Sequence, residues 1–404
     1  MADKIHHRFV VVGGGAGGLS VAAKLLHSGC QDVAIVEPSD THYYQPSWTL
    51  VGAGVVKRED SARPMASLIP NGAEWIRDAV TEFDPAANSL KTRGRKEIGY
   101  DYLVVAPGLQ IDWQKIKGLP EALGKNGVCS NYSYNSVNST WELIRNFQGG
   151  NAVFSFPPPP IKCAGAPQKI MYLAEDYFRR QGIRDKTRVM YYCATPTIFS
   201  APKYAAALTE QVVKPRNIEA FFKHELVEIR GASKEAVVRN LDTGETIVQR
   251  YDMIHVVPPM SSPDFVKQSP LANAAGWVDV SKETMQHVRY PNVFSLGDAS
   301  SLPTSKTAAA VRAQSPLLVA NLLAVVAGEK PTANYDGYTS CPLITGYGKL
   351  ILAEFDYALK PCETFPFDQG KERYSMYLLK RYVLPVIYWS GLVKGYQWPK
   401  PGHA

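Results

Sequence analysis

The chain has 404 residues, of which 45% are hydrophobic and 20% are charged, and its formal net charge is +7. This composition excludes a disordered chain, and the length predicts two or three domains. No basic run typical of nucleic-acid binding is present, so the positive charge favours an anionic membrane surface or an anionic substrate. The six cysteines lack zinc-type spacing, so no metal site is expected.

The N-terminal residues predict a dinucleotide-binding site. An apolar run at 10–12 indicates a strand, and residues 19–27 indicate a helix. Between them lies a G-x-G-x-x-G fingerprint formed by Gly13, Gly15 and Gly18. In this pattern the glycines permit a tight turn, close approach of backbone to a pyrophosphate, and packing of helix on strand. The alternative is a glycine-rich loop in an ordinary α/β domain.

A second strand is expected at 33–36, and it ends in Glu37. Glu37 follows the last fingerprint glycine at about the distance expected, roughly 20 residues, for an acid that binds a ribose hydroxyl. A further buried strand at 102–105 has the character of one that returns to the nucleotide.

The middle of the chain predicts a second Rossmann-like half. Pro167 suits the first turn of a helix that ends near Arg180, and 188–193 indicates a strand. The loop at 194–201 contains no glycine. Because backbone without glycine approaches a pyrophosphate poorly, we expect no good NAD(P) site here.

A strand at 292–296 precedes Gly297-Asp298, and a helix is expected to start in 304–310, with Thr304 or Ser305 as the N-cap. Residues 376–398 suggest two short amphipathic helices separated by Pro385. Their aromatic and basic side chains favour a position in a membrane surface. The alternative is a segment packed on the body or in a dimer interface. No uninterrupted apolar run of 18 residues exists, so no transmembrane helix is expected.

These motifs resemble the sulfide:quinone oxidoreductase family, in its eukaryotic-type branch, over nearly the whole chain. The resemblance rests on the fingerprint and on the stretches 42–54, 162–169, 258–260, 297–298, 303–310 and 338–343. It implies an α/β fold of two Rossmann-like domains plus a C-terminal membrane-associating segment. The implied FAD-binding domain is discontinuous and comprises 1–105 and 290–345. The second Rossmann-like domain would be 106–289, and the C-terminal membrane-associating segment would be 346–404.

The resemblance also implies a cofactor, FAD, and the residues that hold it. The fingerprint glycines and Glu37 would bind its adenosine diphosphate end. The remaining cofactor-binding residues would be Gln45, Pro46, Gly297, Asp298 and Lys306. A helix starting near Ser305 would aim its positive end at the flavin, with Lys306 beside it.

In the family, two cysteines near the flavin react with sulfide, and Cys163 matches the one that forms the persulfide. It lies just before a helix N-terminus and next to Lys162, both of which favour a thiolate. At the position where the resemblance implies the second cysteine, this chain has Ala299. Three interpretations stay open: an engineered variant, use of another cysteine, or a paralogue with altered chemistry. The cysteines considered for the second interpretation are Cys341, Cys193 and Cys129.

The expected function is therefore FAD-dependent oxidation of sulfide, or a related sulfur compound, with electrons passed to a membrane quinone. A small thiol or sulfite would accept the sulfur, and a homodimer is considered. The expected place is a membrane surface, mitochondrial in a eukaryote or the cytoplasmic face of the inner membrane in a bacterium, and no presequence is visible. The alternatives are an NAD(P)H-dependent reductase of the same fold and a weakened flavoprotein that senses sulfur.

Overall fold

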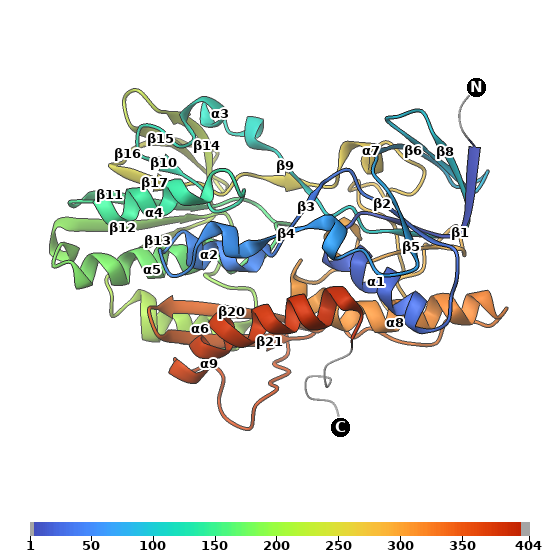
Figure 1. Cartoon of the computed structure of the whole chain (residues 1–404). Helices are drawn as coiled ribbons and strands as arrows, with labels where there is room; N and C mark the ends of the chain where they lie inside the picture. The colour runs from blue at the N-terminus through green and yellow to red at the C-terminus, as the bar shows by residue number, and fades with distance from the viewer. Residues whose placement is uncertain (1–3, 397–404) are drawn as a thin grey trace.

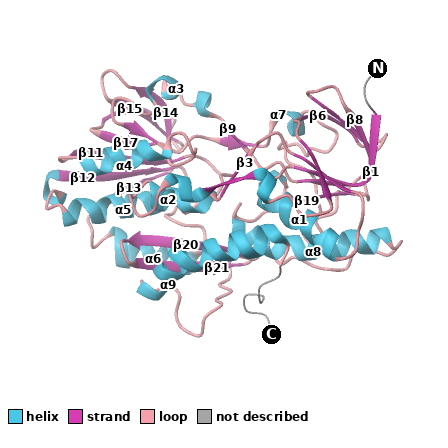
Figure 2. Cartoon of the chain, in the orientation of Figure 1, coloured by secondary structure: helices cyan, strands magenta, loops and turns pink. Residues whose placement is uncertain are grey.

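The computed structural model describes residues 4–396 of the chain. Two sheets stand side by side, on the right and the left of Figure 1, and helices cover them. Figure 2 shows strands at the centre of each half and helices outside. This arrangement confirms the expected α/β fold with two Rossmann-like halves.

The first sheet is built around the fingerprint strand. Its order is β5-β2-β1-β8-β7-β6, and β19 also pairs with β8. The strands β1, β2, β5, β8 and β19 run parallel, whereas β6 and β7 form an antiparallel extension. Their bounds are β1 (Lys4–Val12), β2 (Val33–Val36), β5 (Ala73–Ile76), β6 (Val80–Asp84), β7 (Ser89–Thr92), β8 (Glu97–Val105) and β19 (Val293–Ser295).

The second sheet is entirely parallel, in the order β10-β17-β11-β12-β13. A small antiparallel sheet, β14-β15-β16, lies beside it. The bounds are β10 (Val128–Cys129), β11 (Gly150–Phe156), β12 (Thr187–Cys193), β13 (Glu219–Phe222), β14 (His224–Arg230), β15 (Glu235–Asn240), β16 (Thr246–Arg250) and β17 (Met253–His255). Short two-stranded pairs are β3 (Thr41–Tyr43) with β4 (Ala62–Pro64) and β9 (Gln110–Ile111) with β18 (Met260–Ser261).

Three long helices pack on these sheets: α1 (Ala16–His27), α5 (Ala166–Arg180) and α8 (Ala308–Val326). The shorter ones are α2 (Trp48–Val51), α3 (Leu119–Ala122), α4 (Val137–Asn146), α6 (Pro202–Leu208) and α7 (Asp264–Lys267). By length and composition, α8 is apolar enough to cross a membrane. It packs against α1, and the Ser20 hydroxyl of α1 donates to the Ser315 hydroxyl of α8 at 2.9 Å.

The expected start of α8 was wrong by about one turn. Thr307, not Thr304 or Ser305, is its N-cap, because the Thr307 hydroxyl accepts a hydrogen bond from the Ala310 N–H at 3.0 Å. Residues before it stay extended, since Lys306 forms a β-bridge with Lys162. The interstrand bridge therefore competes with helix formation at these positions.

The C-terminal part begins with a hairpin, β20 (Thr339–Gly346) and β21 (Lys349–Phe355), which packs on α5. A helical run then follows, composed of α9 (Tyr374–Leu378), a π-helical turn, α10 (Leu384–Val386) and further turns to Lys394. It is continuous rather than two separate helices. Pro385 lies in the first turn of α10, and π-helical turns on either side accommodate its missing N–H. Trp398 and Lys400, also expected in this segment, lie outside the described residues.

The helical run, red in Figure 1, joins the two halves. Met376 and Tyr377 contribute to the second hydrophobic core, whereas Tyr388, Leu392 and Val393 contribute to the first. Residues 266–285 also pack into the first core. The three-part division of the chain stays a prediction.

Candidate active site

The fingerprint loop has the geometry that a pyrophosphate needs. Gly13 adopts a φ of +102°, and a Cβ there would overlap the Ala106 carbonyl. A Cβ at Gly18 would overlap the Gly13 carbonyl, so both positions require glycine. At Gly15 a Cβ would meet nothing within 4 Å, so this part of the loop faces open space. The first turn of α1 carries no acidic residue and no side-chain cap, which leaves its N–H groups for an anion.

Glu37 lies at the end of β2, directly against this loop. Its carboxylate accepts hydrogen bonds from the Gly14 N–H and the Ser39 N–H, both at 2.7 Å. On the other side of Gly14, the buried His42 ring contacts the Gly14 carbonyl through Nδ1 at 2.9 Å. His42 Nε2 in turn lies 2.6 Å from the Tyr388 hydroxyl of the helical run. His42 was not singled out in the sequence beyond its motif.

Gln45 and Pro46, which are predicted to lie at the cofactor, each contact a lysine. Lys162 Nζ donates to Gln45 Oε1 at 2.7 Å, and Lys380 Nζ donates to the Pro46 carbonyl at 2.9 Å. Burial lowers the pKa of Lys162 to about 8 and that of Lys380 to about 7. Lys380 comes from the C-terminal run and had no distinguishing signal in the sequence.

Gly297, Asp298 and Lys306 come together at the carboxyl end of β19. Lys306 Nζ donates to the carbonyl of Asp298 at 2.7 Å and lies 3.9 Å from the centre of the Trp277 ring. Burial lowers the pKa of Lys306 to about 8 and raises the pKa of Asp298. This end of β19 neighbours the fingerprint end of β1 through β8, so the residues expected at the cofactor share one edge of the sheet.

Cys163 lies beside this edge. Its N–H donates to the Lys306 carbonyl at 2.9 Å, and its φ is +50°, which is rare for a residue with a side chain. It precedes α5, whose N-cap is Gly165. The backbone pairing with Lys306 therefore fixes the half-buried cysteine next to the proposed cofactor residues.

The second sulfur at this site belongs to Cys341. Cys341 on β20 is hydrogen-bonded to Cys163, and both are free thiols. A Cβ at Gly165 would overlap the Cys341 sulfur, so the glycine makes room for this approach. Ala299 is fully buried and is not needed for the pair. The structure thus supports the interpretation that another cysteine, Cys341, replaces the thiol missing at 299.

The cation that contacts Cys163 is Lys169, not its sequence neighbour Lys162. Lys169 Nζ lies 3.3 Å from Cys163 Sγ, and Lys169 is buried one turn into α5. The other two thiols considered, Cys129 and Cys193, are buried and contact other groups. Lys169 lies in the motif at 162–169, and its position on the first turns of the helix is the sequence signal that identifies it.

The two sulfurs differ in acidity. The hydrogen bond from Cys341 lowers the pKa of Cys163 well below the ordinary range of a thiol, and the charge of Lys169 adds to this against the effect of burial. The same contact and burial raise the pKa of Cys341. The contact of Lys169 Nζ with Cys163 Sγ, at 3.3 Å, favours Cys163 as the thiolate of the pair.

Comparison with known proteins agrees with this geometry. The pyridine nucleotide-disulphide oxidoreductase family matches residues 7–140. The mitochondrial sulfide:quinone oxidoreductase of Mus musculus is 52% identical over 400 residues, covering 98% of this chain and 88% of that protein. The chain belongs to the sulfide:quinone oxidoreductase family.

Two solved structures, each 21% identical, share the fold. One is the sulfide:quinone oxidoreductase of Aquifex aeolicus, with a TM-score of 0.76 over 99% of this chain and 93% of the other. The other is a chain in the mitochondrial ATP synthase structure of Tetrahymena thermophila, with a TM-score of 0.86 over 98% of both chains.

The cofactor of this class is FAD, and the residues present fit it. The open space at Gly15, the uncapped start of α1 and the position of Glu37 suit the adenosine diphosphate end. The roles of Gln45, Pro46, Gly297, Asp298 and Lys306 in binding it stay predictions.

Proposed function

We propose that this protein oxidises hydrogen sulfide at the Cys163–Cys341 pair and passes the electrons through FAD to a quinone. The observation that carries the proposal is the contact between the two thiols, beside the edge of the sheet that carries the cofactor residues. Family membership supports the substrate and the electron acceptor.

The contact of Lys169 with Cys163 assigns the roles of the two sulfurs, because a nearby cation lowers the pKa of a thiol. In thiol–disulfide exchange, the sulfur with the lower pKa leaves more readily. When the pair is oxidised to a disulfide, hydrosulfide therefore attacks the Cys341 sulfur. The bond between the two cysteines breaks, a new S–S bond joins the incoming sulfur to Cys341, and Cys163 leaves as a thiolate stabilised by Lys169. The resemblance alone had implied the persulfide on Cys163.

A small thiol or sulfite then takes the outer sulfur from Cys341, which leaves both cysteines reduced. FAD, when bound, would supply the two-electron acceptor that the pair needs to return to a disulfide, and the electrons would then pass to the quinone. Lys169 keeps positive charge near the two sulfurs and so favours an anionic nucleophile and an anionic acceptor.

The C-terminal helical run is proposed to attach the protein to a membrane surface, where its quinone is dissolved. Tyr382, Val383 and Val386 are exposed on it. Exposed aromatic and apolar side chains of a helix with basic neighbours suit the membrane interface. The mitochondrial relatives are consistent with this place.

Anaerobic mixing of the FAD-loaded protein with sulfide tests the proposal. We expect the flavin absorbance to bleach and to return on addition of a short-chain quinone. Both Cys163→Ala and Cys341→Ala should abolish bleaching, whereas Cys193→Ala, at a buried thiol outside the pair, should not. Bleaching by NADH alone would favour the reductase alternative, and no response to either reductant would favour the sensor.

A further inference from the structure

A surface groove lies between the C-terminal end of α5, the turn of the β20–β21 hairpin and α9. Its volume is about 420 Å³. The lining includes Arg180 and Arg381 together with the tyrosines Tyr347, Tyr374 and Tyr377. The groove lies at the opposite end of α5 from Cys163, so it is separate from the sulfur site.

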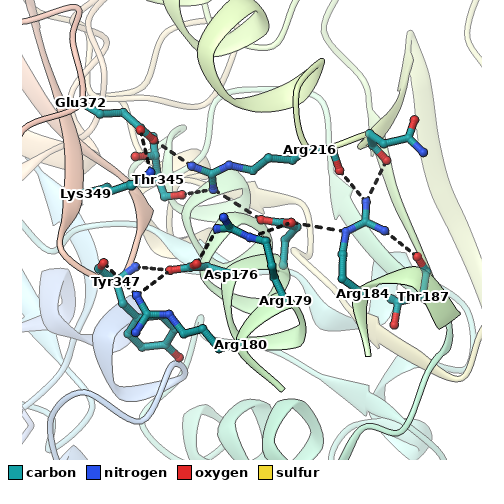
Figure 3. Close-up of polar contacts among 12 residues, drawn as sticks. Asp176, Arg179, Arg180, Arg184, Thr187, Arg216, Thr345, Tyr347, Lys349 and Glu372 are labelled. Carbon is teal, nitrogen blue, oxygen red and sulfur yellow. Dashed lines mark hydrogen bonds and ion pairs between the residues drawn. The ribbon is translucent and has the colours of Figure 1, made fainter. Parts of the chain in front are cut away.

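The hairpin side of the groove is fixed by charged contacts, which Figure 3 shows. Arg180 donates to the Tyr347 carbonyl at 3.2 Å, and its guanidinium lies 5.0 Å from the centre of the Tyr347 ring. Asp176 Oδ2 accepts from the Tyr347 N–H at 2.7 Å. These contacts hold one guanidinium and one aromatic ring in a set orientation.

The groove carries more positive than negative charge. The carboxylate of Asp176 is shared between Arg179, at 2.5 Å, and Arg180, at 3.3 Å. Arg381, which contacts the Tyr377 hydroxyl and the Tyr382 ring, has no carboxylate within 4.0 Å in the part of the chain that the structure describes. Two guanidinium groups therefore line the groove, and no carboxylate is among its described lining residues.

The helical run that contributes Tyr374, Tyr377 and Arg381 to the groove also carries exposed apolar and aromatic side chains. Tyr374 in the groove is 64% exposed, and Tyr382 and Val386 farther along are 56% and 54% exposed. Guanidinium groups match the oxygen atoms of phosphate esters, and tyrosines collect where headgroups meet acyl chains. A ligand with an anionic head and an apolar body would satisfy both parts of this surface.

We propose that this groove binds the anionic headgroup of a membrane phospholipid and so fixes how the protein lies on the bilayer. The proposal rests on the membrane attachment in the proposed function and goes further, since it names the lipid class and the arginines that recognise it. Arg381 contributes charge from the helical run, and Arg180 contributes an oriented guanidinium from α5.

Vesicle binding of the FAD-loaded protein tests the proposal. The probes are vesicles of phosphatidylcholine alone and of phosphatidylcholine mixed with phosphatidylglycerol. We expect tighter binding to the mixed vesicles, and we expect Arg381→Gln to weaken that binding about fivefold, since a basic residue near an anionic surface contributes about 1 kcal/mol. Binding to pure phosphatidylcholine should change little. Arg180→Gln should act in the same direction.

The matched control is Arg250→Gln, which removes an exposed arginine from β16, on the far side of the molecule from α9 in Figure 1. It should leave both affinities unchanged. Equal losses for Arg381→Gln and Arg250→Gln, or no preference for mixed vesicles, would overturn the proposal. A rise in the Tm of lipid-free protein with inorganic phosphate that Arg381→Gln removes would also overturn it, since the groove would then serve a soluble anion.

Turnover of sulfide with a short-chain quinone in lipid-free buffer distinguishes a failure of the proposed lipid site from a failure of the proposed function. We expect Arg381→Gln to keep wild-type turnover, because neither the sulfurs nor the cofactor residues contact Arg381. Normal turnover with unchanged vesicle preference would refute only the lipid site. If the wild-type protein shows no turnover of sulfide with the quinone, the proposed function is refuted instead.

Discussion

At the scale of single residues, the site depends on two sulfurs that are far apart in the sequence. Cys163 precedes a helix and follows a conspicuous proline run, so its motif was readable. Cys341 is a strand residue without local signals, and its contact with Cys163 arises only when β20 packs on α5. Sequence reasoning could name Cys341 as one of three candidates, but only tertiary packing distinguishes it from Cys129 and Cys193.

Lys169 controls the acidity of Cys163, and its removal should be visible as a pH shift. The contact with Cys341 and the charge of Lys169 both lower the pKa of Cys163, so the thiolate persists at pH values where an ordinary thiol is protonated. In Lys169→Met this pKa should rise, and the midpoint of the pH dependence of Cys163 alkylation should move upward. Lys203→Met, at a lysine paired with Glu363, is the control. An unchanged midpoint would show that Lys169 does not act on the thiolate.

Alanine substitutions at two fingerprint glycines should reduce FAD retention for different reasons. Gly15→Ala places its methyl group in open space, so the apoprotein should keep its Tm while FAD retention falls. Gly18→Ala forces a methyl group against the Gly13 carbonyl and should lower both the Tm and FAD retention. The measurements are thermal unfolding without cofactor and the flavin content after gel filtration. Full FAD retention in Gly15→Ala would contradict the assignment of the loop.

At the scale of elements, charged contacts between α5 and the β20–β21 hairpin hold the two cysteine-bearing segments together. Glu175 is buried against Arg184 and Arg216 at 3.3 and 3.5 Å, and Arg216 also donates to the Thr345 carbonyl. Figure 3 shows this network from α5 to the hairpin. Its ion pairs join elements that are distant in the sequence, so no local sequence pattern predicts them.

Loss of one member of this network should destabilise the hairpin. Asp176→Asn removes the charge that Arg179 and Arg180 share, and it should lower the free energy of unfolding by about 1 to 3 kcal/mol. Asp185→Asn, at an exposed position just beyond α5, should change it by less than about 0.5 kcal/mol. Urea denaturation of the two variants gives the comparison. Equal small effects would show that the pairs contribute little.

The regular elements were largely predictable because their patterns are local. Hydrophobic runs bounded by glycine or proline predict the strand–glycine–helix unit, the helix that starts at Ala166 and the strand that ends at Cys193. The start of α8 was not predictable, because a β-bridge to Lys162 determines it. The continuity of the C-terminal run was not predictable either, because it depends on packing against both cores.

At the scale of the whole molecule, the C-terminal run connects the proposed membrane surface to the cofactor loop. Its Tyr388 hydroxyl contacts the buried His42, whose other nitrogen contacts the Gly14 carbonyl. The Gly395 carbonyl also accepts a hydrogen bond from Lys24 Nζ of α1, at 3.1 Å. The run is thus packed into both cores of the protein rather than appended to its surface.

Breaking this link should loosen the run. Tyr388→Phe leaves the ring but removes the hydroxyl, and it should cost about 1 kcal/mol of stability and speed amide exchange over residues 384–394. Tyr382→Phe changes an exposed tyrosine of the same run and should alter neither quantity. Identical exchange in the two variants would show that the contact with His42 does not secure the run.

The most direct test of the account is to locate the sulfur that the protein takes from its substrate. Protein with an oxidised pair would be treated with sulfide in the absence of an acceptor, the free thiols would be alkylated, and the peptides would be mapped by mass spectrometry. We predict one additional sulfur atom on the peptide that contains Cys341 and an alkylated Cys163. Additional sulfur on Cys163, Cys129 or Cys193, or none on Cys341, would contradict the account.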